Sequence, residues 1–184
     1  MPVFESAAMI PPQTRREALT EVRAQLDTVS GSILNIRVGG NDLSHAFGLR
    51  RPANRTIYDL RPVADILIDI VAAFGTQYVV SGPVWEYYSG EGWEEGLRRE
   101  MELDLLNGFT GKTVIHPNQI PVVNEMLRVS RQDYADARAI LNWDTGSGSL
   151  VSASEDGGRM NEYNTHSRWA RRIVLRAERY GVRA

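Results

Sequence analysis

The chain has 184 residues, a length typical of one domain, and its 21 basic and 23 acidic residues give a net charge of −2. No global positive field is present to recruit nucleic acid or an anionic membrane. Hydrophobic residues make up 42% and charged residues 24%, which is ordinary for a globular protein and argues against disorder. The lack of cysteine excludes disulfides, thiolate nucleophiles and cysteine-based metal sites. Because no signal peptide or membrane-length apolar run is found, we expect a soluble, cytoplasmic protein.

The first half of the chain alternates between strand-like and helix-like segments. Residues 3–6 begin with a strand-like pair, and a capping box at 14–17 predicts the start of a helix. Residues 32–39 predict a second strand, which ends in a Gly-Asn-Asp loop. A helix is expected over 59–75, since an apolar stripe at helical spacing is closed there by a glycine.

The alternation continues through the next segments. Residues 77–84 predict a strand, and 93–107 predict a helix that a following glycine stops. A short buried strand is expected over 112–115, followed by a helix to about residue 129. A second capping box, from Ser130 to Asp133, predicts one more helix.

Four strand–helix units in succession favour a parallel α/β sheet, because parallel strands need helical crossovers. Strand starts near residues 3, 33, 77 and 112 give units of roughly 36 residues, close to those of a TIM (β/α)₈ barrel. Four units correspond to half of such a barrel. A doubly wound sheet is the alternative, but its glycine-rich first turn is absent from the start of the chain.

The C-terminal segment differs in composition from the rest. Residues 142–158 are rich in glycine, serine and aspartate and predict a loop or a small hairpin around Leu150-Val151. Residues 165–180 predict a helix that buries Trp169, Ile173, Val174 and Ala177. We therefore divide the chain into a partial barrel over 1–141 and a loop with a C-terminal helix over 142–184, which packs on the barrel as a cap.

Two acidic residues follow predicted strands. Glu5 comes directly after the first strand, and Asp42 lies in the loop after the second. In a (β/α)₈ barrel, residues at the carboxyl ends of strands point into the active site. Two carboxylates from neighbouring strands can hold Mg²⁺ and leave coordination positions for water and substrate oxygens. The alternatives are that Glu5 is a frayed terminal residue and that Asp42 caps the helix it precedes.

Other strand ends carry residues suited to a pocket. Gly39-Gly40 permits close backbone approach, although a plain tight turn also explains it. Ser81-Gly82-Pro83 can line a pocket or simply bend the chain into the next loop. Lys112, the only lysine, and His116 lie along the fourth strand, where His116 can equally cap the strand end.

Two further features are interpreted as structural. The histidines have no metal-ligand spacing, so histidine-bound zinc is not expected; they are His45, His116 and His166. The last helix carries a basic stripe, which we interpret as a solvated face rather than a nucleic acid or phosphate site; it consists of Arg168, Arg172, Arg176 and Arg179.

Several strings together resemble the citrate lyase β-subunit-like branch of the HpcH/HpaI aldolase superfamily. Residues 108–120, GFTGKTVIHPNQI, look like that family's GFxGKxxIHPxQI signature. Residues 39–43, GGNDL, followed by GLRR at 48–51, are similar to its metal-binding GxxDL segment. The initial PVFES resembles the preceding strand with its acidic metal ligand. The chain looks most like a bacterial subgroup of predicted C–C bond lyases encoded beside tellurite-resistance genes.

This resemblance implies a Mg²⁺-dependent carbon–carbon lyase on a TIM barrel. Glu5 and Asp42 would hold Mg²⁺, which would chelate a 2-oxo or 2-hydroxy carboxylate or acyl-CoA-type substrate and stabilise the enolate formed as the C–C bond breaks. The pocket would be lined by backbone at the strand ends, namely Gly40, Gly82 and Pro83. Lys112 and His116 match signature positions as catalytic candidates, and we assign them to strand geometry and pocket support before catalysis.

The sequence departs from the family pattern in two ways. Citrate and malyl-CoA lyases usually have an aspartate where this chain has Ser81, which weighs against a CoA ester. The family's substrate-carboxylate arginine lies on an early strand that is absent here. We therefore expect only the second half of the barrel, inactive alone, and a homo-oligomer or an association with a missing N-terminal half. The alternative is a non-catalytic half-barrel that binds or assembles with another chain.

Overall fold

The computed structural model describes residues 1–143 and 151–183. The chain forms two compact units, one over Met1–Met126 and one that begins at Leu127. Each unit has its own strands, helices and hydrophobic core. None of the described helices combines the length and apolar character that crossing a membrane requires.

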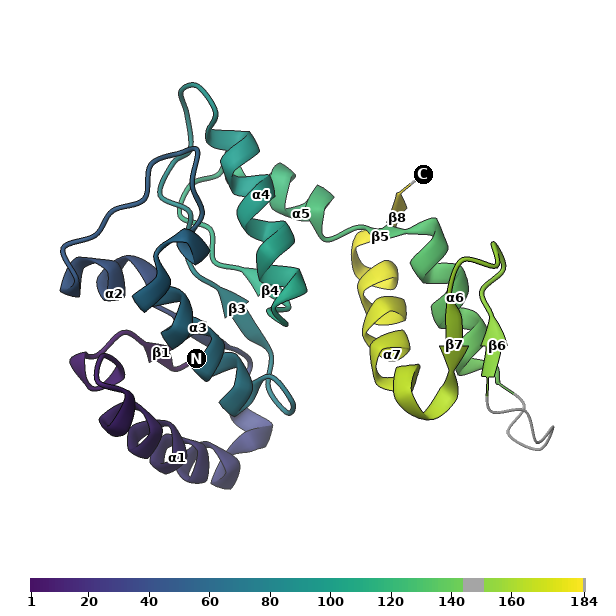
Figure 1. The fold of residues 1–184 in the computed structure, drawn as a ribbon, viewed down its shortest axis with the longest axis horizontal. Helices are drawn as coiled ribbons and strands as arrows, with labels where there is room; N and C mark the ends of the chain where they lie inside the picture. Colours follow the sequence, from purple (N-terminus) through teal and green to yellow (C-terminus); the bar gives the residue numbers. More distant parts are fainter. Residues whose placement is uncertain (144–150, 184) are drawn as a thin grey trace. The chain divides into compact units, whose positions relative to one another are not determined.

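The first unit contains a four-stranded parallel sheet, and Figure 1 colours its strands and helices in chain order. The strands are β1 (Val3–Phe4), β2 (Ile36–Val38), β3 (Val80–Gly82) and β4 (Gly111–Lys112), and they lie in the order β1-β2-β3-β4. Every neighbouring pair is parallel. The predicted succession of strand and helix is therefore confirmed in this unit, since each parallel neighbour is reached through helical chain.

Helices connect these strands and cover one face of the sheet. The α-helices are α1 (Pro12–Thr28), α2 (Gly40–Ala46), α3 (Arg61–Phe74), α4 (Trp93–Leu106) and α5 (Gln119–Met126), and the short 3₁₀ helices are η1 (Ala7–Met9), η2 (Ser30–Ser32) and η3 (Ile57–Asp59). The predicted apolar stripe of α3 is fully buried at Val63, Leu67, Ile70 and Phe74. The Phe74 ring lies 5.0 Å from the ring of Phe4, so α3 packs directly on β1.

The strand register assigns side chains to the two faces of the sheet. Phe4, Ile36 and Val80 point toward the helices and belong to the core. The opposite face carries one row of register partners: Val3, Arg37, Ser81 and Gly111. Val3 is 43% exposed, and Val79, which shares this face, is 49% exposed. Among the described residues, this second face of the sheet, called the open face below, is thus exposed at Val3 and Val79, although Ser81 in the same row is buried.

Several predicted boundaries in the first unit are wrong. The capping box at 14–17 does not start α1, which begins at Pro12 because proline suits the first helical position. The Thr14 hydroxyl, in the first turn of the helix, instead donates to the carbonyls of Ala8 at 3.0 Å and Pro11 at 3.2 Å, which both precede the helix. The predicted strand over 32–39 is shorter, since its first residue ends the 3₁₀ helix η2.

Two more expectations need correction. Asp59 does not start α3 but closes a capping box with Thr56 around η3, so that α3 begins at Arg61. The predicted buried strand over 112–115 pairs with β3 only through Lys112. Ile115 is 54% exposed, because the chain has left the sheet at this point.

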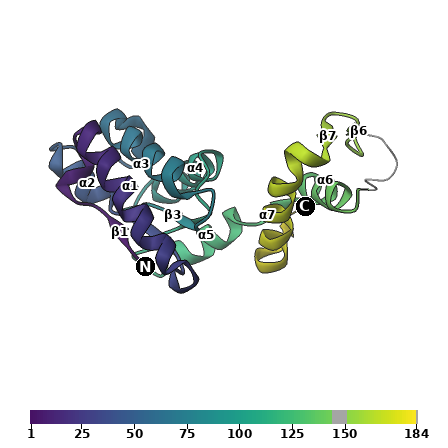
Figure 2. The ribbon, with the colours of Figure 1, turned by 90° about the horizontal axis from the view of Figure 1, so that it is seen from below.

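The second unit is built on two helices that lie side by side in both views (Figure 1, Figure 2). Its elements are β5 (Val129–Ser130), α6 (Arg131–Leu141), β6 (Val151–Ala153), β7 (Met160–Glu162), α7 (Tyr163–Tyr180) and β8 (Val182–Arg183). The predicted cap is confirmed, since Ser130 Oγ accepts a hydrogen bond from the Asp133 amide at 3.0 Å. Ile173 and Ala177 of α7 are buried, as expected, against Ile140 of α6.

The division between the units differs from the boundary we expected after residue 141. Helix α6 lies in the second unit, where its apolar face packs on α7. A hairpin is present, since β6 and β7 pair in antiparallel fashion, but its second strand, β7, lies beyond the predicted 142–158 segment. Leu150, part of the apolar pair predicted in it, lies outside the described residues, and the packing of 142–184 on the barrel stays a prediction.

Candidate functional site

Glu5 and Asp42 converge at the carboxyl ends of β1 and β2. A Cβ atom placed on Gly39 would lie 2.6 Å from Glu5 Oε2 and 3.0 Å from Asp42 Oδ2. The two carboxylate oxygens therefore border the same small space, which Gly39 leaves free because it has no side chain. Gly39 faces Glu5 because its amide donates a hydrogen bond to the carbonyl of Phe4 at 3.0 Å.

This pair suits a hard cation. Both carboxylates are exposed, so each can accept a ligand from solvent. The described residues contain no cluster of three or more His, Cys, Asp or Glu side chains with metal-site geometry. A Mg²⁺ ion typically keeps several waters and takes only one or two protein carboxylates, which is what this donor set offers. The geometry thus fits the cation expected from the sequence.

The face of the sheet that carries Glu5 also carries a positive charge, that of Arg37. Arg37 precedes Gly39 by two residues, so its side chain points to the same face as Glu5. Its guanidinium is partly exposed, and the structure gives it no hydrogen-bond or ion-pair partner among the described residues. Ser81 shares the row, is buried, and accepts a hydrogen bond from Asn35 Nδ2 at 2.7 Å. Sequence reasoning missed Arg37, although strand alternation places it on this face.

The glycines predicted to line a pocket lie where neighbouring residues leave no room for a side chain. A Cβ on Gly40 would lie 2.6 Å from Pro83 Cβ, so these two residues are in contact across the ends of β2 and β3. A Cβ on Gly82 would lie 2.5 Å from Asp104 Oδ2, on the side of the sheet that faces α4. Gly82 thus points away from Glu5, and the substrate contacts assigned to Gly40, Gly82 and Pro83 stay predictions.

Lys112 lies in a buried ionic network on the helix side of the sheet. Its Nζ atom donates to Glu100 Oε1 and to Asp104 Oδ2, each at 2.7 Å, and all three side chains are sealed from solvent. Burial raises the pKa of Asp104, which the Lys112 ammonium opposes. The Tyr58 hydroxyl donates to Asp104 at 2.7 Å, and burial raises the pKa of Tyr58. This placement favours the supporting role of Lys112 over catalysis.

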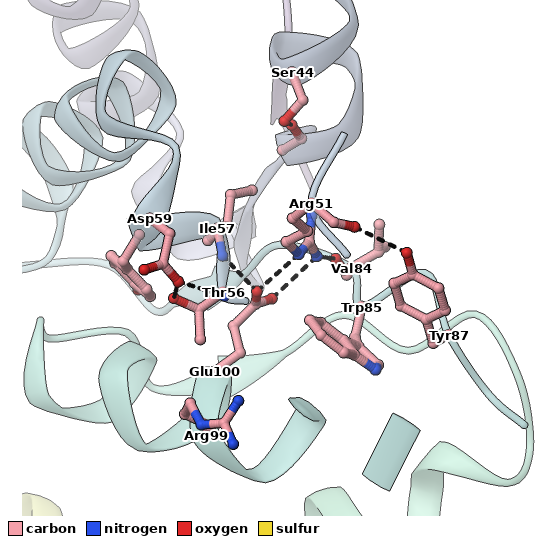
Figure 3. Close-up of polar contacts among 12 residues, drawn as sticks. Ser44, Arg51, Thr56, Ile57, Asp59, Val84, Trp85, Tyr87, Arg99 and Glu100 are labelled. Atoms are coloured by element: carbon pink, nitrogen blue, oxygen red, sulfur yellow. Dashed lines mark hydrogen bonds and ion pairs between the residues drawn. The ribbon is translucent and has the colours of Figure 1, made fainter. Parts of the chain in front are cut away.

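Arg51 also belongs to this network through Glu100, and Figure 3 shows the contacts between these two side chains. Its Nε atom lies 2.9 Å from Glu100 Oε2, and both side chains are buried. Sequence reasoning missed Glu100 and Asp104. Their spacing was a usable signal, because three and seven residues after Leu97 they fall on the buried face of α4.

His116 lies after β4, in the loop that leads to α5. Its ring stacks on Tyr88 at 4.1 Å between centroids, and its Nδ1 atom accepts a hydrogen bond from the Asn118 amide at 3.2 Å. Within the described ranges, no hydrogen bond joins His116 to Glu5 or Asp42. Its role as a catalytic residue therefore stays a prediction.

A cavity of about 430 Å³ lies beside Asn41, the neighbour of Asp42. Its polar lining includes His45, Arg50 and Glu86. A second cavity, of about 380 Å³, lies between α1 and α3 and is lined by none of the strand-end residues. Of these two cavities, only the first is lined by a residue next to Asp42 in the chain.

A protein-family model described as C–C bond lyase of the TIM-barrel fold matches residues 1–182, nearly the whole chain. The chain belongs to this family. The expected superfamily is thereby confirmed, and so is the TIM-barrel fold, whereas the restriction to half of a barrel with a C-terminal cap stays a prediction.

Two relatives of this family member agree with the superfamily. L-malyl-CoA/beta-methylmalyl-CoA lyase of Cereibacter sphaeroides is 38% identical over 74 residues, which are 39% of this chain and 22% of that protein. The structure of CitE from Mycobacterium tuberculosis, in complex with magnesium, acetoacetate and coenzyme A, has a TM-score of 0.58 at 26% identity. That match covers 79% of this chain and 52% of the CitE chain. The chain thus spans less than two thirds of the length of either relative.

Proposed function

We propose that the protein is a Mg²⁺-dependent carbon–carbon lyase that cleaves a 2-oxo or 2-hydroxy acid or an acyl-CoA-type substrate. The observation that carries this proposal is the convergence of Glu5 and Asp42 on the space beside Gly39. Family membership supports the reaction class, and the magnesium and coenzyme A bound by CitE support the cation and the substrate type.

Glu5 and Asp42 are the residues that would hold the cation. When bound, Mg²⁺ supplies a Lewis acid that stabilises negative charge on the substrate as the C–C bond breaks. Gly39 contributes because a side chain at this position would collide with Glu5 and crowd the Asp42 carboxylate. Both side chains are exposed, so substrate oxygens can reach them without rearrangement of the core.

Arg37 is our candidate for the residue that binds the substrate carboxylate. It lies on the same face of the sheet as Glu5, and a guanidinium suits bidentate pairing with a carboxylate. Lys112 does not serve as a Schiff-base lysine in this proposal, because its ammonium is sealed between two carboxylates.

Binding of Mn²⁺ to the purified 184-residue chain tests the metal site, with Mn²⁺ standing in for Mg²⁺ and free Mn²⁺ followed by electron paramagnetic resonance. We expect saturable binding that Mg²⁺ displaces, and loss of it in Glu5→Gln and in Asp42→Asn. The matched control is Asp65→Asn, which removes an exposed α3 carboxylate that pairs with Arg61. Equal Mn²⁺ affinity in all four proteins would contradict the proposed site.

A second candidate is a half-barrel that functions only after pairing with another half-barrel or a second copy. The sheet favours it, because β1 and β4 each have one strand neighbour among the described residues and Val3 and Val79 lie exposed on the open face. We expect sedimentation to show association and the isolated chain to lack lyase activity. Mg²⁺-dependent cleavage of a 2-oxo or 2-hydroxy acid by a monodisperse monomer would rule this candidate out.

A further inference from the structure

The residue next to Asp42 is tied to the interior of the protein. Asn41 Oδ1 accepts a hydrogen bond from Arg51 Nη1 at 3.1 Å. Asn41 and Asp42 both lie in the first turn of α2, where the Leu43 amide donates to the carbonyl of Gly39 at 3.0 Å. A contact that fixes the Asn41 side chain therefore also restricts the backbone that carries Asp42.

Arg51 is itself firmly held. Its side chain is 1% exposed and contacts Glu100 through Nε at 2.9 Å. Its Nη2 atom donates to the Val84 carbonyl at 2.6 Å, beyond the end of β3. The guanidinium carbon also lies 5.1 Å from the centre of the Trp85 ring. Figure 3 shows these contacts, which leave the planar guanidinium a single orientation.

Glu100 is fixed from three sides. Its Oε2 atom accepts from the Ile57 amide at 2.7 Å, in addition to the Arg51 pair. Its Oε1 atom accepts from Lys112 Nζ at 2.7 Å. The carboxylate thus joins α4 to η3, to β4 and, through Arg51, to the turn that follows β2. Because each of its oxygens accepts a hydrogen bond from a donor on another element, the Glu100 carboxylate is restricted to one arrangement.

We propose that Arg51 is a positioning residue that holds the Asn41–Asp42 turn so that the Asp42 carboxylate faces Glu5. Arg51 acts through Asn41 and is not itself a ligand of the cation in this proposal. Its importance for metal binding rests on the proposed function, whereas its hold on the turn does not. Partners behind a metal ligand commonly change metal affinity by 10–100-fold when removed, which sets the expected size of the effect.

Asn41→Ala is the decisive variant, because it removes the acceptor at the turn and leaves the Arg51–Glu100 pair intact. The matched control is Ser44→Ala on the same helix, which removes a buried hydrogen bond from Ser44 Oγ to the Gly40 carbonyl at 2.7 Å but no contact to the network. Asn41→Asp is the conservative variant, since a carboxylate oxygen can still accept from Arg51.

The first measurement is amide hydrogen exchange at Leu43 in the metal-free chain. We expect Asn41→Ala to speed this exchange about tenfold, while Asn41→Asp and Ser44→Ala stay close to the wild-type rate. The second measurement is Mn²⁺ affinity, which we expect to fall about tenfold in Asn41→Ala and to stay unchanged in Ser44→Ala.

The two measurements separate the two proposals. If Leu43 exchanges at the wild-type rate in Asn41→Ala, Arg51 does not hold the turn and this inference is overturned. If the wild-type chain binds no Mn²⁺ while Leu43 responds as expected, the positioning role stands and the proposed metal site fails. Faster exchange without any change in Mn²⁺ affinity would overturn the role of Arg51 in metal binding.

Discussion

The Lys112 ammonium nitrogen lies 2.7 Å from Asp104 Oδ2, and neither side chain reaches solvent. Gly82, the register partner of Lys112 on β3, provides the room for the Asp104 carboxylate. The signature lysine therefore ties β4 to α4, on the face of the sheet opposite to Glu5 and Gly39. Family signatures can mark residues that build the barrel as well as residues that act on the substrate.

We expect Lys112→Met to lower the free energy of unfolding by about 3–5 kcal/mol, because it leaves two buried carboxylates with one cation fewer. Urea denaturation, monitored by tryptophan fluorescence, measures this change in the free energy of unfolding. Arg61→Met is the control, since it breaks an exposed i,i+4 pair with Asp65 and should change stability by no more than about 0.5 kcal/mol. Equal effects of the two substitutions would refute the ionic network as a source of stability.

Gly39→Ala is expected to weaken Mn²⁺ binding by at least about tenfold, since its Cβ would occupy the space between Glu5 and Asp42. The backbone at Gly39, with φ of −82°, suits alanine, so the effect comes from the collision of the new Cβ with Glu5, whose Cβ would lie 2.5 Å away. Gly31→Ala serves as the control, because a Cβ there meets no atom within 4 Å. Unchanged Mn²⁺ affinity in Gly39→Ala would argue against a cation at this position.

Asp59 makes the folding stability depend on pH in the acid range. The Thr56 amide donates to its carboxylate at 2.7 Å and, with the Thr56 hydroxyl, holds the pKa of Asp59 below the ordinary 3.8. A lowered pKa contributes stability above about pH 3.8 that is lost as the pH falls through the folded-state value. Carboxyl carbon NMR titration should show this lowered pKa.

Thr56→Ala tests the cause of the Asp59 shift. Because the backbone amide at position 56 remains as a donor, we expect the pKa of Asp59 to rise only part of the way to its ordinary value. Asp59→Asn should flatten the fall in stability with acid, measured by urea denaturation at neutral and acid pH. An unchanged slope in Asp59→Asn would show that other groups carry the acid dependence.

Ser130→Ala should cost the second unit about 1 kcal/mol, because the Asp133 amide loses its 3.0 Å acceptor at the start of α6. Amide exchange in the first turn of α6 measures the local effect, and urea denaturation the global one. Ser152→Ala in the exposed β6 strand should change stability by less than about 0.5 kcal/mol. A larger loss in Ser152→Ala than in Ser130→Ala would contradict the assignment of the cap.

Local sequence patterns correctly predicted the features that depend on a few neighbouring residues. The Ser130–Asp133 cap and the apolar stripe of α3 are confirmed, since both depend on contacts within one helix and on its single buried face. Thr14 shows where such patterns mislead, because proline two residues earlier competes for the helix start. Strand lengths were overestimated for a similar reason, as pairing with neighbouring strands and not β-propensity ends a strand.

The sequence by itself determined the fold class, the order of strands and helices, and the position of Glu5 and Asp42 at strand ends. Only the tertiary structure decided which face of the sheet each of these residues occupies and which groups meet there. Lys112 of β4 meets the Glu100 carboxylate of α4, and Arg51 reaches the same carboxylate across 49 positions in the chain. Such contacts depend on how helices pack on the sheet, and this packing is fixed by the whole core rather than by any local run of residues.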